Sequence, residues 1–418
     1  MPSTVVHETQ VTAIVAEMQG GGESSAVDAR YHKWCVVPAG EHIAALSVRD
    51  AVSSGSGDCP RYDAPCEVGH YSLLGEGEEF EYVDGAAAKR YLRTPIPSEP
   101  MLNLNTGYAK AVRISRISVA PRESVLRWVI LNKDKVVKCS ANEEAPSSGP
   151  ETKSVSTDFI CHRRCLTVPM CTPFNEENSW RMTACRHRGI VYIHDHPTKD
   201  EIDEYIKERS IKNLDRMMYW GVKFHRIMTT PEPGVGPEED ELVREGDTYN
   251  AVLRGQLGSH SLLMATEVKA VDPSVKCESD STAGYVEFKT NRKCSTAWHH
   301  SKFCKHKLLS WWAQSRLAGV PRALCGFRDD EGWLVDIKEF DVMTMPDKAE
   351  GQWSEDVCMR FCDRLLSFIK EHVKGDDGRT VYFFEYVPSS REITCTRLTD
   401  PGKLYALPDW FLEAFEGC

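Results

Sequence analysis

Two predicted strands each carry a glutamate followed two residues later by a lysine, and ionisable groups in this arrangement can do chemistry. The pairs are Glu267 with Lys269 in Met264–Asp272, and Glu287 with Lys289 in Gly284–Thr290. Residues two apart on a strand point to the same face, so each pair should lie on one side of its strand. The polar residues 273–283 between the strands can turn the chain back. The pattern predicts either a site where the four groups meet or a half-exposed hairpin whose charges are solvated.

The segment around and after the second strand is basic, although the chain as a whole is acidic. The 418 residues carry a formal net charge of −11, which excludes a global positive field for nucleic acid. Between Phe288 and Arg328, however, there are nine Lys or Arg residues and no Asp or Glu. This composition predicts either a local surface for phosphate groups beside the paired charges or a solvated helix face.

A helix predicted at 302–317 adds aromatic side chains to this basic segment. Lys307, Trp311 and Gln314 recur at four- and three-residue steps and should share one face of the helix. Aromatic rings stack on bases and lysines contact phosphates when proteins bind single-stranded RNA. The alternative is that Trp311 and Trp312 are core residues, which we favour for Trp312.

Nothing in the sequence indicates secretion or a membrane span. We find no charged start followed by an apolar run, and no run of about 18 apolar residues. We therefore expect an intracellular protein, in the nucleus or cytosol, with no membrane partner. The 16 cysteines are scattered singly and should be reduced. Cys161 and Cys165 with His194 and His196 could hold zinc, although their spacing matches no standard finger or ribbon.

The order of the predicted elements indicates a mixed α/β or α+β fold around a mixed sheet. Strands are expected at 158–167, 180–186, 190–194, 334–343, 381–386 and 392–398. Helices are expected at 198–220, 302–317, 354–373 and 409–415. Residues 124–131 fit a buried strand or a short helix equally well. Residues 1–29 should be flexible, and loops are expected near 140–157 and 230–248.

Several segments around the paired charges closely resemble the decapping exoribonuclease (DXO) family. They are Leu257-Gly-Ser-His260, His306-Lys-Leu-Leu-Ser-Trp-Trp-Ala-Gln-Ser315, Gly319-Val-Pro321 and Cys325-Gly-Phe-Arg328. The resemblance runs from about Asp158 to Phe411 and is strongest between Met217 and Arg328. It implies one large domain, residues 30–418, with two β-sheets, flanking helices and a cleft between the sheets.

The resemblance also implies a function. The family removes abnormal or NAD-type caps from RNA 5′ ends and can degrade the RNA behind them in the 5′→3′ direction. By this likeness the chain is a phosphodiester hydrolase whose partner is an RNA 5′ end or a nucleotide, and some members of the family dock on a separate 5′→3′ exoribonuclease. The family's divalent cations, Mg²⁺ or Mn²⁺, prefer carboxylate ligands and assist attack on the phosphate.

The family's site residues are only partly present in this sequence. Those that match are Glu267, Glu287 and Lys289 for catalysis, of which Glu267 and Glu287 would also bind the metal. Arg163 and Gln314 match for phosphate binding, to which the helix face adds Lys307. The segment Gly221-Val-Lys-Phe-His225 ends in histidine where the family has glutamate. The segment Glu267-Val-Lys269 ends in lysine where the family has aspartate.

These two replacements disfavour a divalent cation. Protonated lysine has no lone pair and repels a cation, by about 4 kcal/mol for each unit-charge pair at about 4 Å and an effective dielectric constant of about 20. We therefore expect an RNA 5′-end or nucleotide-binding protein with weak or no catalysis, in which Lys269 takes the cation's place. A divalent cation, Mg²⁺ or Mn²⁺, is expected only if the site is active. The alternatives are an active Mg²⁺- or Mn²⁺-dependent nuclease, with His225 or Asp272 completing the site, and a protein-interaction module.

Overall fold

The computed structural model of the chain describes most of the sequence. The described residues are 39–53, 59–77, 79–97, 101–114, 120–136, 157–203, 214–236, 241–349, 351–402, 404 and 407–416. The segment 1–29 lies outside them, as does the loop expected near 140–157 apart from its last residue. In the loop expected near 230–248, residues 231–236 and 241–247 form turns and an isolated bridge.

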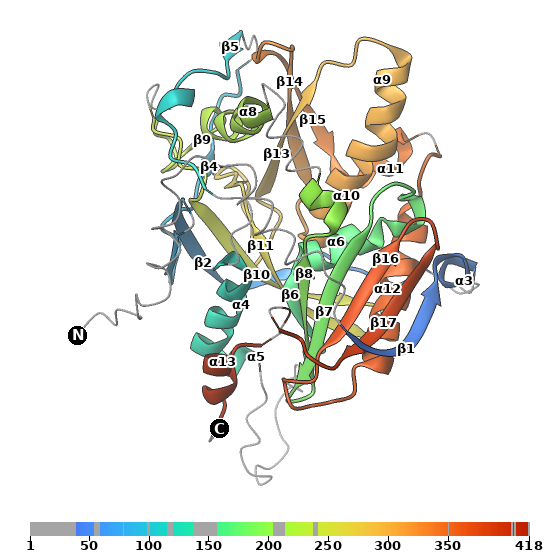
Figure 1. Cartoon of the computed structure of the whole chain (residues 1–418). Coiled ribbons are helices and arrows are strands. Elements are labelled where there is room, and N and C mark those ends of the chain that lie inside the picture. The colour runs from blue at the N-terminus through green and yellow to red at the C-terminus, as the bar shows by residue number, and fades with distance from the viewer. Residues whose placement is uncertain are drawn as a thin grey trace, which may run out of the picture.

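The larger of two sheets has ten strands and forms the lower part of the molecule in Figure 1. In spatial order they are β1 (Gly40–Ser47), β17 (Glu392–Leu398), β16 (Tyr382–Val387), β7 (Trp180–His187), β8 (Ile190–His196), β6 (Phe159–His162), β11 (His260–Glu267), β10 (Thr248–Leu257), β2 (Cys66–Glu76) and β3 (Glu79–Val83). The sheet is antiparallel except at β6, which pairs in parallel with both β8 and β11.

The second sheet has seven strands, several of them very short. In spatial order they are β5 (Leu102–Asn103), β15 (Trp333–Asp341), β14 (Arg322–Arg328), β13 (Tyr285–Arg292), β12 (Ala270–Val271), β4 (Tyr91–Leu92) and β9 (Thr229–Thr230). The strand β13 pairs in parallel with β14 and antiparallel with β12. One mixed α/β domain with two sheets and flanking helices is thus confirmed.

Helices cover the two sheets in layers (Figure 1). The α-helices are α3 (Val48–Ser53), α4 (Ala120–Leu131), α5 (Lys133–Val136), α6 (Arg164–Met170), α8 (Leu214–Ile227), α9 (Ala297–Lys302), α10 (Leu309–Leu317), α11 (Met345–Lys348), α12 (Glu355–His372) and α13 (Asp409–Glu413). The 3₁₀ turns are η1 (Tyr108–Lys110), η2 (Thr172–Phe174) and η4 (Val342–Thr344), and η3 (Phe303–Leu308) is a π-helical turn. One face of the larger sheet packs on α4 and α13, and its other face packs on α6, α10 and α12. The helix α8 covers the second sheet.

The central strands are apolar on both faces because each separates two cores. In β6, Phe159 and Cys161 belong to the core with α6, α10 and α12, whereas Ile160 belongs to the core with α4. In β13, Val286 and Phe288 belong to the core with α8. The alternation predicted for β13 is therefore confirmed, and its intervening residues point away from α8.

Two predicted strands differ from the structure. The expected strand at 158–167 ends at His162, because the backbone of Arg163 is helical (φ −47°, ψ −37°) and the chain turns there into α6. The expected strand 264–272 is two strands, β11 and β12, that belong to different sheets. In the second case long-range backbone pairing decides where the strands divide, and local periodicity does not report it.

Most other predicted elements are confirmed. The expected hairpin is β16 and β17, and the expected helices at 354–373 and 409–415 correspond to α12 and α13. Residues 124–131, which fitted either type, lie in α4. The helix expected at 302–317 comprises η3 and α10, with one π turn. Residues 199–203 and α8 are helical, and 204–213 between them lie outside the described residues.

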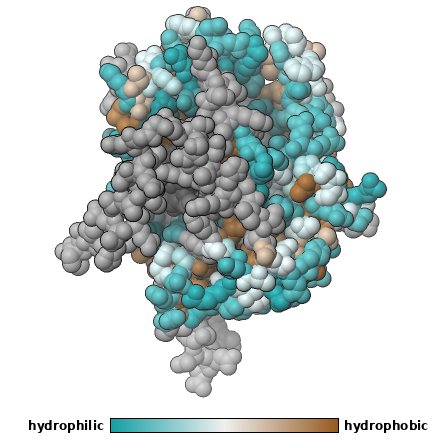
Figure 2. Space-filling view, in the orientation of Figure 1, coloured by the Kyte–Doolittle hydropathy of each residue, from teal (hydrophilic) through white to brown (hydrophobic). Residues whose placement is uncertain are grey.

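The surface shown in Figure 2 is coloured by the hydropathy of each residue. Figure 2 shows that the described residues on this face are mostly hydrophilic, with hydrophobic residues scattered among them. Among the described residues, no helix is both long and apolar enough to cross a membrane.

The two adjacent tryptophans of α10 are both buried, and they allow a test of the central core. Trp312 is fully buried, with its ring 5.3 Å from that of Trp353. We expect Trp312→Ala to lower the free energy of unfolding by about 3–5 kcal/mol, because it leaves a large cavity. The matched control is Trp298→Ala, which removes a side chain that is 62% exposed and should change it by less than about 0.5 kcal/mol. Urea denaturation of both variants makes the comparison, and equal losses would contradict this assignment of the core.

Candidate functional site

The chain crosses from the larger sheet to the second sheet at a two-residue link, Val268–Lys269. The Val268 N–H still donates to the Tyr249 carbonyl of β10 at 2.9 Å, whereas Ala270 pairs with Val286 of β13. From the polar segment 273–283, which can turn the chain back, we expect the Glu267 and Glu287 strands to be neighbours in one sheet, and this expectation is wrong. The strand β11, which carries Glu267, lies in the larger sheet, and its continuation β12 is the neighbour of β13.

The deepest part of the candidate site is built around Glu287, whose side chain is only 3% exposed. Lys289 Nζ lies 3.6 Å from Glu287 Oε1 and donates to Gln314 Oε1 at 2.8 Å. Arg163 Nη1 lies 3.9 Å from Glu287 Oε2 and donates to the Gln314 carbonyl at 3.1 Å. The turn between β6 and α6, the strand β13 and the helix α10 thus bring these four predicted site residues together.

The more accessible part of the site consists of Glu267 and Lys269. Their side chains are 34% and 29% exposed, and Lys269 Nζ lies 2.5 Å from Glu267 Oε1. Both belong to the same electrostatic cluster as the buried part, because Lys269 acts on the charge of Glu287 and both act on Lys289. We call the six residues Arg163, Glu267, Lys269, Glu287, Lys289 and Gln314 the charged cluster.

Cations outnumber carboxylates in the charged cluster. Burial alone would raise the pKa of Glu287, but Lys289, Arg163, Lys269 and the Phe288 N–H outweigh it and hold this pKa below its usual range. Burial lowers the pKa of Lys289, and Arg163 and Lys269 lower it further, against the attraction of Glu287. A group that adds negative charge, such as phosphate, would relieve this excess.

His225 lies beside the cluster but its ring is already engaged. Burial, followed by the charges of Lys269 and Arg226, holds the pKa of His225 well below its usual value, so the ring is neutral. His225 Nε2 lies 2.6 Å from the Lys269 carbonyl oxygen. A carbonyl can only accept, so Nε2 carries the proton and donates it, and this nitrogen has no lone pair for a metal.

The residues present do not fit the divalent cation that the resemblance implies. Within the described part of the chain, no group of three or more His, Cys, Asp or Glu residues is placed to hold a metal ion. At the charged cluster, the Lys269 ammonium forms an ion pair with the Glu267 carboxylate. The Nε2–H of His225 donates a hydrogen bond to the Lys269 carbonyl. Hard cations need several free oxygen ligands, which this arrangement does not offer.

Two alternative ligand sets from the sequence also fail. Asp272 forms an ion pair with Arg322 and accepts from the Ser274 hydroxyl at 2.7 Å, so it does not complete the site. The suggested zinc site does not form either, because the His196 ring is bonded to the Thr183 hydroxyl at 2.8 Å and the Cys165 thiol points to the Ile193 carbonyl at 3.6 Å.

The predicted common face of Lys307, Trp311 and Gln314 is wrong. Trp311 is 5% exposed and packs edge-on against Phe303, with ring centroids 5.2 Å apart. Lys307 is exposed on the π turn η3. The two side chains therefore lie in different environments, and Trp311 is a core residue with no face for a base.

Sequence reasoning missed two arginines next to the charged cluster whose side chains are at most 10% exposed. Arg90 makes paired hydrogen bonds to Glu241 at 2.7 and 2.8 Å, and Arg226 Nη1 lies 3.4 Å from the same carboxylate. Arg226 also interacts electrostatically with Glu267. The position of Arg226 directly after His225 could have indicated that it lies near the site. Nothing in the local sequence indicates this for Arg90, whose partner Glu241 is 151 residues away.

A third missed residue, Glu67 of β2, links the two sheets through hydrogen bonds. Its carboxylate accepts hydrogen bonds from Tyr249 of the larger sheet, at 3.2 Å, and from Tyr285 of the second sheet. Its other neighbour is His70, at 2.7 Å. Tyr285 and Glu287 lie on the same face of β13. The bridge therefore fixes β13 against the larger sheet two residues before the buried carboxylate.

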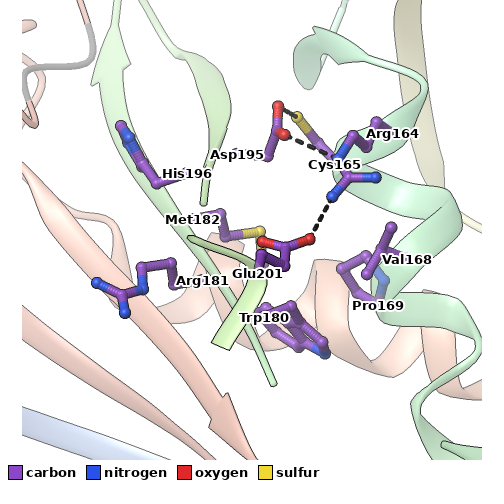
Figure 3. Close-up of a pocket in the computed structure, with 10 residues that line it drawn as sticks. All are labelled: Arg164, Cys165, Val168, Pro169, Trp180, Arg181, Met182, Asp195, His196 and Glu201. Carbon is purple, nitrogen blue, oxygen red and sulfur yellow. Dashed lines mark hydrogen bonds and ion pairs between the residues drawn. The ribbon is translucent and has the colours of Figure 1, made fainter. Parts of the chain in front are cut away.

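The pockets described in the structure lie away from the charged cluster. One, drawn in Figure 3, contains none of the charged-cluster residues in its lining, which consists of Arg164, Cys165, Val168, Pro169, Trp180, Arg181, Met182, Asp195, His196 and Glu201. In it Arg164 is paired with Asp195 at 3.0 Å and Glu201 at 2.7 Å. The other adjoins α13, around His187 and Phe415.

Comparison with known proteins gives the same family as the residues did. A family model described as RAI1-like PD-(D/E)XK nuclease matches residues 63–412. The chain belongs to this family. A decapping and exoribonuclease protein from Xenopus laevis is 32% identical over 376 residues, covering 88% of this chain and 90% of the relative. The human protein of that description is 31% identical over 366 residues, covering 86% and 87%.

Solved structures of RAI1-like proteins share the fold. Scheffersomyces stipitis Rai1, in complex with (3′-NADP)⁺ and calcium ion, aligns with a TM-score of 0.72 at 19% identity over 92% of this chain and all of the other. Candida albicans Rai1, in complex with pU5-Mn²⁺, aligns with a TM-score of 0.71 at 21% identity over 89% and 98%. The RAI1-like match begins well before Asp158, so it covers more of the chain than the sequence motifs indicated.

The buried carboxylate of this RAI1-like chain should make stability depend on acid pH. The fold holds the pKa of Glu287 below its ordinary value of 4.5, so the ionised carboxylate stabilises the folded state at pH values above 4.5. This contribution is lost as the pH falls below 4.5 and through the lowered pKa. We expect the stability difference between the unmodified protein and Glu287→Gln to be large at about pH 7 and to shrink towards about pH 4. His225 is present in both proteins and does not affect the difference. Urea denaturation at the two pH values measures it, and a constant difference would contradict the pairing.

Proposed function

We propose that this RAI1-like protein binds the phosphorylated 5′ end of RNA, or a nucleotide, at the charged cluster and hydrolyses it weakly or not at all. Arg163, Lys269 and Lys289 would contact the phosphate, and Gln314 would orient Arg163 and Lys289. The proposal keeps the ligand class of the relatives and removes the cation from the site.

The observation that carries this proposal is the position of the Lys269 ammonium. It lies 2.5 Å from the Glu267 carboxylate and interacts electrostatically with Glu287, so one positive charge acts on both carboxylates. An ammonium attracts phosphate as a divalent cation does, but it cannot lower the pKa of a bound water to make a nucleophile. In this proposal the protein still binds the phosphate, but attack of water on the phosphate is no longer assisted by a cation.

The arginine supports binding of a terminal phosphate in particular. Arg163 uses one nitrogen for the Gln314 carbonyl, which holds its guanidinium plane in place, and its side chain is 15% exposed. A guanidinium held in this way can donate two parallel hydrogen bonds to phosphate oxygens. The complexes of related proteins with pU5-Mn²⁺ and (3′-NADP)⁺ support RNA and nucleotide ligands for this fold.

Binding of short RNAs with and without a 5′ phosphate tests the proposal. We expect a 5′-phosphorylated oligonucleotide to bind at least about 10-fold more tightly than its 5′-hydroxyl counterpart, because charge-assisted hydrogen bonds contribute about 1.5–3 kcal/mol each. Affinity should also fall clearly between about 50 and 200 mM salt. Fluorescence anisotropy gives both quantities in the presence of a chelator.

Two outcomes would contradict the proposal in different ways. Equal affinity for the two RNA ends would remove 5′-phosphate recognition. Binding that appears only when Mn²⁺ or Mg²⁺ is added would restore the metal-dependent reading of the site.

A further inference from the structure

The helix α9 carries an exposed tryptophan surrounded by basic residues. Trp298 is 62% exposed, the largest exposed fraction of any tryptophan among the described residues. Lys302 Nζ lies 4.4 Å from the centroid of its ring, and the His299 ring centroid lies 5.4 Å away. These contacts are local to the helix, so the core does not require a large aromatic side chain here.

The segment of chain that carries Trp298 is rich in basic residues. We call residues Lys293–Lys307 the basic arm; in it Lys293, Lys302 and Lys307 are exposed, and it contains no Asp or Glu. Lys305 lies 3.8 Å from Glu176 Oε2, which fixes the arm beside the loop after η2. In a chain of net charge −11, such a stretch is a local field for an anionic polymer.

The basic arm leads directly to the charged cluster. It follows β13, which carries Glu287 and Lys289, and runs through η3 into α10, which carries Gln314. Figure 1 shows α9 at the edge of the molecule, with α10 nearer to its centre. At about 1.5 Å per residue, the helical stretch from Trp298 to Gln314 is about 20–25 Å long.

We propose that the basic arm is a distal subsite for single-stranded RNA, in which Trp298 stacks on a base and Lys302 and Lys307 contact the neighbouring phosphates. The inference rests on the proposed function, since the 5′ end of the same RNA occupies the charged cluster. Base stacking on an aromatic side chain tolerates any sequence, and lysines beside it follow the backbone. The subsite would therefore select length and single-strandedness, without reading sequence.

The length of the RNA separates this subsite from the charged cluster. At about 3.4 Å per stacked nucleotide, a trinucleotide spans about 10 Å and a dodecanucleotide about 40 Å. Only the longer RNA can occupy both places. We therefore expect Trp298→Ala to weaken binding of a 5′-phosphorylated dodecanucleotide by about 5- to 100-fold and to leave the 5′-phosphorylated trinucleotide unchanged.

Matched variants make the test specific. Trp410→Ala removes another exposed tryptophan with a cation over its ring, Arg127 at 5.9 Å, but on α13. It should leave both affinities unchanged. Trp298→Phe should restore part of the loss, and Lys302→Ala should reduce the slope of log affinity against log salt by about 0.7 for the dodecanucleotide.

Each outcome decides between the two proposals. If Trp298→Ala binds the dodecanucleotide as tightly as the unmodified protein does, the RNA subsite is wrong, and an acidic protein partner becomes the explanation for the exposed ring. If 5′-phosphorylated and 5′-hydroxyl dodecanucleotides bind equally and both are weakened by Trp298→Ala, the subsite stands and the proposed 5′-phosphate recognition fails. If the unmodified protein binds neither RNA, both proposals are overturned.

Discussion

The double change His225→Glu with Lys269→Asp should create Mn²⁺ binding at a site where we expect none in the unmodified protein. It removes the ammonium from Glu267, replaces a proton-donating ring with a carboxylate, and turns an excess of positive charge into an excess of negative charge. At about 4 Å and an effective dielectric constant of about 20, each charge changed alters the interaction with a unit positive charge by about 4 kcal/mol. The effect should be correspondingly larger for a divalent ion.

Titration of Mn²⁺ by calorimetry, together with hydrolysis of 5′-phosphorylated RNA, measures the result. We expect each single change to bind Mn²⁺ far more weakly than the double change, because the carboxylates share one ion and their effects are not additive. Adding Glu267→Ala to the double change is the control and should abolish binding. Vigorous Mn²⁺-dependent hydrolysis by the unmodified protein, lost in Glu267→Ala, would show that the argument from lost carboxylates is wrong.

Replacing Arg163 with alanine should produce the largest loss of RNA binding among single changes in the charged cluster. The guanidinium lies 3.9 Å from Glu287 and is oriented by the Gln314 carbonyl at 3.1 Å. Losing its charge-assisted hydrogen bonds should weaken the binding of 5′-phosphorylated RNA by about 10- to 100-fold, with little effect on the binding of 5′-hydroxyl RNA. Arg163→Lys should be intermediate, because it keeps the charge but not the planar fork.

The next residue supplies a matched control. Arg164 points into the pocket of Figure 3, where Asp195 and Glu201 pair with it, so Arg164→Ala should leave RNA affinity unchanged. Anisotropy titrations of the three variants with both RNA ends give the comparison. A similar loss for Arg163→Ala and Arg164→Ala would indicate a general loss of charge or structure and would remove Arg163 from the site.

The sequence predicted those parts of the site that depend on local periodicity. The alternation of β13 placed Glu287 and Lys289 on one face, and their charged atoms are 3.6 Å apart. The loss of acid at residues 225 and 269 could also be inferred from the motifs. Each of these inferences needs only a strand's two-residue period or a short segment of neighbouring residues.

The sequence could not predict features that depend on distant partners. The crossing at Val268–Lys269 follows from backbone bonds to Tyr249 on one side and pairing with β13 on the other. Glu67 showed no local signal, because its tyrosine partners are 182 and 218 residues away. The burial of Trp311 reflects packing against Phe303 and Phe340, which helical spacing alone does not reveal.

The link between the sheets is held from both sides at Lys269. Its side chain forms an ion pair with Glu267 of the larger sheet. Its carbonyl accepts a hydrogen bond from His225 of α8, the helix that packs on the second sheet. Sliding of one sheet past the other would have to break one of these bonds or the Glu67 bridge. The fold itself therefore sets the spacing of the charges in the charged cluster. Discrimination between RNA ends would then be made by a rigid template, without closure of the protein around its ligand.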